Sequence, residues 1–160
     1  MNDNYNYVLL LATLLSGNVL AVNIDASNDW SSCQLQNTIT QAGDYYSSTL
    51  SSDEATLSCD DAFLTITGVA TSTTSWSVST RLVDSLSGMN LELRRSGNGT
   101  GDSTPSGGDS YTTLSTAPQA FFSGQGNVSS IPLQFRIRNF DVSAGNGSLN
   151  LQIQYQITTN

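Results

Sequence analysis

The chain has 160 residues, a length that suits a single domain with its own hydrophobic core. Only 11% of the residues are charged, and 13 acidic against 5 basic side chains give a formal net charge of −8. All the basic residues are arginines, and the chain has neither lysine nor histidine. Phosphate backbones are bound by clustered cations, and most nucleophilic, zinc-dependent and Schiff-base mechanisms need histidine or lysine. We therefore expect no nucleic-acid partner, no cofactor and no enzymatic activity.

Residues 1–21 have the pattern of a secretory signal peptide. An apolar run extends from Val8 to Leu15, and Val19-Leu20-Ala21 matches the small-x-small site of a signal peptidase. The run is too short to cross a bilayer as a stable helix. We therefore expect a secreted or cell-surface protein whose mature part, residues 22–160, is one domain without a membrane span. The open alternative is that this segment stays on the mature protein as a strand or an assembly arm.

The mature chain alternates apolar and polar side chains with a period of two, which is typical of strands with one buried face. The first alternation is short, with Val22, Ile24 and Ala26 on its apolar side. Further alternations end at turns rich in Gly, Ser and Asn; they lie in residues 33–39, 57–59, 62–66, 76–82 and 89–93. No stretch has convincing helical spacing of its apolar residues. This pattern predicts an antiparallel two-sheet β-sandwich, with a barrel as the alternative.

Cys33 and Cys59 are the only cysteines. An even pair in an exported chain is typical of a disulfide, which here would tie two early strands together. Closing a loop between positions 33 and 59 should stabilise the fold by about 3 to 4 kcal/mol. The alternative is a pair of buried free thiols.

The stretch Ser96–Ser110 is polar and Gly-rich, and it predicts a long mobile loop with nothing to bury.

The last thirty residues contain the two longest alternations, Ile131–Ile137 and Leu149–Ile157, on either side of an Asn146-Gly147 turn signal. They predict a long antiparallel hairpin at the end of the chain. The alternation also predicts which residues face inward, namely Phe135, Ile137, Leu151 and Ile153, and which face solvent or a partner, namely Arg136, Arg138, Gln152 and Gln154.

Paired carboxylates are the catalytic device that the composition leaves open. Asp53-Glu54 and Asp60-Asp61 are each adjacent in sequence. Neighbours on a strand point to opposite faces, so neither pair places two carboxyl groups across one glycosidic bond. Asp102 and Asp109 in the Gly-rich loop lack the spacing of a calcium-binding loop. We therefore expect neither catalytic nor metal-binding residues.

Aromatic side chains could form a stacking platform for a sugar. Trp76 lies in phase with Val78 and Leu82, which favours a position in the core. Tyr45-Tyr46 is the better surface candidate, because one of two adjacent strand residues must face outward.

Several stretches of the chain resemble the archaic chaperone-usher pilins of the spore coat protein U-like family. In that family an apolar strand follows a Gly-rich turn, and an alternating strand closes the chain after a corner. The matching stretches here are Phe122-Ser123-Gly124-Gln125-Gly126, Ile131-Pro132-Leu133-Gln134-Phe135-Arg136-Ile137, Ala144-Gly145-Asn146-Gly147-Ser148-Leu149 and Gln152-Ile153-Gln154-Tyr155. The front half is similar in its short first strand and in its two cysteines.

The spacing of the alternations and turns predicts about 7–9 strands. The resemblance implies that they form an incomplete immunoglobulin-like β-sandwich, whose hydrophobic groove is filled by the N-terminal strand of the next subunit. The donated strand would contain Val22, Ile24 and Ala26. The groove edge would contain Leu149, Leu151, Ile153, Tyr155 and Ile157. Partners would then be further copies or related subunits, with help from a periplasmic chaperone.

Independent physical reasoning also favours assembly, because a long apolar edge strand is an association hazard unless another strand pairs with it. We therefore expect an exported structural subunit of a surface filament, pilus or extracellular matrix. The alternative is a secreted adhesin or carbohydrate-binding module that uses surface aromatic residues and the Ser96–Ser110 loop.

Overall fold

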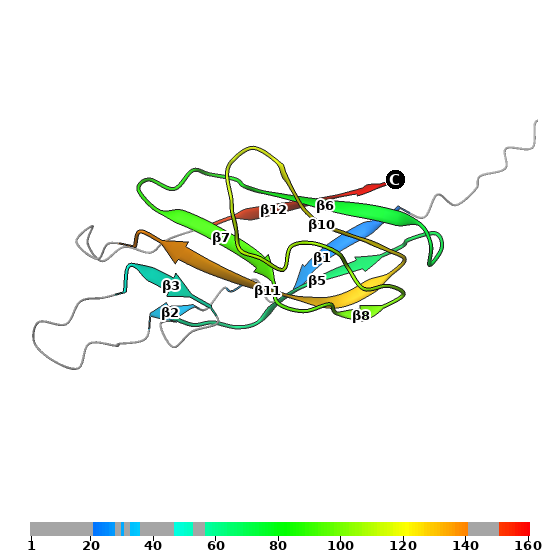
Figure 1. Cartoon of the computed structure of the whole chain (residues 1–160), viewed down its shortest axis with the longest axis horizontal. Coiled ribbons are helices and arrows are strands. Elements are labelled where there is room, and N and C mark those ends of the chain that lie inside the picture. The colour runs from blue at the N-terminus through cyan, green and yellow to red at the C-terminus, as the bar shows by residue number, and fades with distance from the viewer. Residues whose placement is uncertain (1–20, 28–29, 31–32, 36–46, 53–56, 141–150) are drawn as a thin grey trace, which may run out of the picture.

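The computed structural model describes residues 21–27, 30, 33–35, 47–52, 57–140 and 151–160. These residues form strands and connecting turns but no helix, and every strand pair is antiparallel. Two main sheets form the layers of a sandwich (Figure 1). The predicted all-β immunoglobulin-like sandwich is therefore confirmed, and the two sheets do not join into one barrel. The described residues contain twelve strands rather than seven to nine. Five of them have only two or three residues, namely β2 (Gln34–Leu35), β3 (Thr49–Ser51), β4 (Leu57–Ser58), β8 (Thr100–Gly101) and β9 (Thr112–Thr113).

The larger layer, called the large sheet below, has the strand order β1-β5-β11-β7-β9. Its strands are β1 (Asn23–Ser27), β5 (Ala62–Thr67), β11 (Val128–Arg138), β7 (Asn90–Arg95) and β9 (Thr112–Thr113). The long central strand β11 has two partners on each side. It pairs with β5 and then β3 (Thr49–Ser51) along one side, and with β8 (Thr100–Gly101) and then β7 along the other.

The other layer is a three-stranded sheet with the order β10-β6-β12. Its strands are β10 (Gln119–Gln125), β6 (Ser75–Leu82) and β12 (Ile153–Thr159). The inward side chains of both layers make one core, as the alternation predicts. Trp76 on β6 is fully buried, and its Nε1 donates a hydrogen bond to the carbonyl oxygen of Gly126 at 2.7 Å. The predicted core position of Trp76 is confirmed.

The predicted C-terminal hairpin is wrong. Its two strands belong to different layers: β11 lies in the large sheet, whereas β12 pairs with β6, with Ile153 opposite Leu82. Each strand has one apolar face. A sandwich buries the apolar face of one strand against that of the other across the core, so the two strands need not pair. The predicted turn at residues 146–147 lies outside the described residues. The inward register is confirmed, because Phe135 and Ile137 are buried, while Leu151 and Ile153 are half-buried against the core.

The Gly-rich stretch 96–110 is anchored, contrary to the prediction that it has nothing to bury. The guanidinium of Arg95, a residue only 7% exposed, donates hydrogen bonds to the carbonyl oxygens of Gly97, Pro105 and Gly107 and to Oδ1 of Asn98. A buried guanidinium needs acceptors, and the folded-over loop supplies them from its own backbone.

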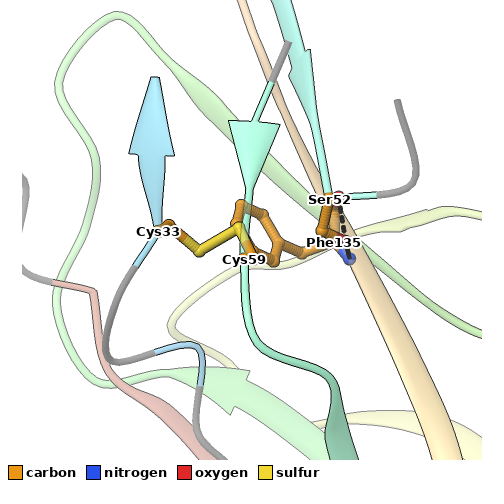
Figure 2. The surroundings of a disulfide bond; sticks show 4 residues. All are labelled: Cys33, Ser52, Cys59 and Phe135. Carbon is orange, nitrogen blue, oxygen red and sulfur yellow. Dashed lines mark hydrogen bonds between the residues drawn. A yellow bond between two sulfur atoms is a disulfide. The ribbon is translucent and has the colours of Figure 1, made fainter. Parts of the chain in front are cut away.

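The predicted disulfide is confirmed. Cys33 and Cys59 are bonded, and Figure 2 shows the bond joining the start of β2 (Gln34–Leu35) to the end of β4 (Leu57–Ser58). The same figure shows Ser52, at the end of β3, bonded to β11. Its backbone N–H donates to the carbonyl oxygen of Phe135, and its hydroxyl oxygen accepts from the Phe135 N–H, both at 3.0 Å. The disulfide thus ties two early segments to each other, and the Ser52 hydrogen bonds tie the end of β3 to the central strand.

Candidate assembly edge

The last strand, β12, lies at the edge of the three-stranded sheet and pairs only with β6 among the described residues. Two backbone hydrogen bonds, each 3.0 Å long, flank the ladder between β12 and β6. Val83 N–H donates to the Gln152 carbonyl, and Asn160 N–H donates to the Ser75 carbonyl. Bonding alternates along an antiparallel pair, so even-numbered residues of β12 bond to β6. The odd-numbered residues, from Ile153 to Thr159, therefore direct their N–H and C=O groups to the open edge.

No charged residue lies on β12, in a chain whose net charge is −8. Strand β10 is also uncharged, and the one charged residue of this sheet is Arg81 on β6. Its Nε donates to Gln154 Oε1 at 2.6 Å. Native sheet edges are usually blocked by lysine, proline, a bulge or a very short strand. β12 has seven residues and contains neither lysine nor proline.

The predicted groove residues lie along the inner face of this strand. Leu151, Ile153, Tyr155 and Ile157 are each half-buried and contact the core, whereas Leu149 lies outside the described residues. Burial raises the pKa of the Tyr155 phenol by desolvating its ionised form. Directly opposite Tyr155 on β6 is Thr80, a residue 1% exposed whose hydroxyl has no hydrogen-bond partner among the described residues.

The predicted donor strand forms β1, which pairs with β5 of the same chain and places Ile24 opposite Ile66. Val22 and Ile24 are half-buried against the core, and Ala26 is exposed. β1 is the outermost strand of the large sheet and lies close to β12. The structure thus brings the two predicted assembly segments to the same side of the sandwich, in a chain where β1 already has one partner.

A cluster of arginines on the outer face of the large sheet was not anticipated from the sequence. Arg136 and Arg138 on β11 both donate through Nε to Oε2 of Glu92 on β7. Arg94 donates to Gln134 Oε1, and the guanidiniums of Arg94 and Arg136 lie 4.6 and 4.1 Å from the Tyr111 ring centre. Alternation predicts the outward direction of these side chains, but it does not predict that β7 and β11 are neighbours.

The other candidate residues that the structure describes do not form a site, and Asp53-Glu54 lies outside the described residues. Asp102 accepts a hydrogen bond from the Asn127 backbone N–H at 2.8 Å, and Tyr45-Tyr46 lies outside the described residues. No group of three or more histidine, cysteine, aspartate or glutamate side chains that could hold a metal occurs in the part of the chain that is described. The described residues also contain no helix that is long and apolar enough to cross a membrane.

Comparison with protein-family models, with curated proteins and with solved structures finds no match to this chain.

Proposed function

We propose that the chain is a non-enzymatic, exported structural subunit that assembles with further copies by β-strand addition at the outer edge of β12. The observation that supports this function is the open edge itself. It has seven residues, no charge, and a row of backbone donors and acceptors for which no described residue provides a partner.

Pairing with another strand would satisfy these groups and cover the half-buried apolar row beneath them. Each cross-strand side-chain pair adds roughly 0.2 to 1 kcal/mol, and the main-chain ladder adds affinity along the whole length of the strand. The absence of charge matters because copies of a chain with a net charge of −8 repel one another. They can approach most closely where no carboxylate must be brought near another.

The proposed donor is the N-terminal strand, with Val22, Ile24 and Ala26 on its apolar face. One side of β1 pairs with β5, and the other side has no partner strand among the described residues. β1 can therefore add to a neighbour's β12 through its free side. Joining one surface to a different surface of the next copy makes an open chain of subunits, the geometry of a filament, when the rotation between copies does not close into a ring.

A pair of lysine variants tests the acceptor edge. The double variant Gln154→Lys/Gln156→Lys adds two charges beside the open edge at exposed positions, and Ala120→Lys/Ser123→Lys adds the same charge at exposed positions on β10 of the same sheet. At physiological ionic strength we expect the wild-type chain and the β10 variant to assemble with rising concentration in sedimentation velocity, and the β12 variant to stay monomeric and folded. A wild-type chain that is monomeric at every concentration refutes the proposal and favours a binding module. Equal loss of assembly in both variants refutes the choice of edge.

A mixing experiment tests the donor. Ala26→Lys places a charge on the exposed end of β1 and leaves β12 intact, while the β12 double variant leaves β1 intact. Neither variant should polymerise alone, and together they should form a one-to-one complex because one donor and one acceptor remain. Polymers of Ala26→Lys alone would show that β1 is not the donor.

A further inference from the structure

The outer face of the large sheet holds three of the five arginines of the chain on two neighbouring strands. Arg94 on β7 lies opposite Gln134 on β11, and Arg136 on β11 lies opposite Glu92 on β7. Arg138 lies two residues further along β11. All three point away from the core, and two of them, Arg136 and Arg138, share the carboxylate of Glu92.

Glu92 fixes the orientation of two of these guanidiniums. Its side chain is 12% exposed, and its Oε2 accepts from Nε of both Arg136 and Arg138, while Oε1 accepts from the Thr113 hydroxyl at 3.4 Å. The terminal Nη groups of Arg136 and Arg138 make no hydrogen bond to any described residue. Their side chains are 26% and 49% exposed. Both guanidiniums are therefore held at Nε, and Arg136 also lies against the Tyr111 ring, while their Nη nitrogens remain available for bidentate binding of a carboxylate.

The rest of the molecule offers the complementary chemistry. Asp25, Asp61, Asp84 and Asp109 are exposed, and none of their carboxylates makes a hydrogen bond or an ion pair with a described residue. The chain has thirteen acidic and five basic residues, so most of the charges that a second copy carries outside this cluster are negative. Charge complementarity therefore favours a second copy as the occupant.

The geometry points to a second contact between copies, in which Arg136 and Arg138 bind exposed carboxylates of a neighbouring copy. This contact lies on the other layer of the sandwich from β12 and goes beyond strand addition. It joins unlike surfaces, so it could link assembled chains laterally as well as single subunits. Glu92 is a positioning residue here, because it acts through the two guanidiniums.

The experiment uses the Gln154→Lys/Gln156→Lys chain, in which strand addition is blocked, at low ionic strength. We expect this chain to self-associate weakly. Adding Arg136→Gln/Arg138→Gln should weaken the association about tenfold, since each exposed pair contributes modestly. Arg81→Gln, which removes one cation from the opposite face, serves as the control for Arg138→Gln, and only the latter should weaken association. The arginine-depleted chain should associate again when it is mixed with a second blocked-edge chain in which Asp25, Asp61, Asp84 and Asp109 are changed to Asn. The first chain then supplies the carboxylates and the second supplies the arginines.

Three outcomes overturn this contact. The first is a blocked-edge chain that stays monomeric at low ionic strength, which would leave strand addition intact. The second is equal weakening by Arg81→Gln and Arg138→Gln, which would show a general charge effect. The third is binding of a carboxylated polysaccharide such as alginate at the arginines without self-association, which would make the site a ligand site. Conversely, assembly of the wild-type chain that depends on the arginines and not on β12 would refute strand addition while supporting this contact.

Discussion

Replacing Thr80 by valine should stabilise the protein. Thr80 lies in the middle of β6 on the core side, opposite Tyr155, and is 1% exposed. Its Oγ1 is buried and has no hydrogen-bond partner in the part of the chain that the structure describes. A buried hydroxyl without a partner costs about 1 to 3 kcal/mol, and valine has nearly the same shape and no polar atom. The methyl group that replaces the hydroxyl is itself buried, which adds up to about 0.8 kcal/mol to the stability. We expect the free energy of unfolding to rise by about 1 to 2 kcal/mol.

The assay is urea unfolding at a concentration where the chain is monomeric, with the disulfide intact. The midpoint should rise while the slope m stays constant, and the melting temperature should rise by about 2 to 4 °C per kcal/mol for a chain of this size. Thr65→Val is the matched control. The Thr65 hydroxyl accepts from the Ser130 backbone N–H at 3.2 Å, so the same substitution should destabilise there by about 0.5 to 1.5 kcal/mol. A loss of stability in Thr80→Val, or equal effects at the two positions, would refute the reasoning.

Two further predictions concern the three-stranded sheet. Burial raises the pKa of Tyr155 above its ordinary value of 10.0, so its contribution to stability is fully present below pH 10 and is lost as the pH rises above 10. We therefore expect the free energy of unfolding, measured in urea, to fall between pH 9 and pH 11, and Tyr155→Phe to reduce that fall. An equally steep fall in the variant would assign it to other groups. Gly124→Ala should destabilise the protein by about 1 to 3 kcal/mol, because a Cβ at this position would lie 2.6 Å from two ring carbons of the buried Trp76. As the control, Ser123→Ala at an exposed position should change stability by less than about 0.5 kcal/mol. Similar values for the two variants would mean that the ring of Trp76 can move aside freely.

Local alternation determined much of this fold. A strand places successive side chains on opposite faces whatever its partner, so the period of two in Ile131–Ile137 identifies both the strand and its buried face. The same rule gave the core position of Trp76 and the inward side of β12. The cysteine pair followed from composition and number. Alternation also indicates the burial of Arg95, because this residue shares its face of the strand with Leu91 and Leu93.

Tertiary structure alone decided which strands are partners. Backbone hydrogen bonds are the same for every sequence, so two well-formed alternating strands close in the chain can pair with each other or face each other across a core. β11 and β12 took the second arrangement, which left β12 at an edge. Pairing of β7 with β11 likewise placed Glu92 beside Arg136 and Arg138. Both proposed contact surfaces arise from this choice of neighbours, since residues far apart in the chain meet only when the layers are assembled.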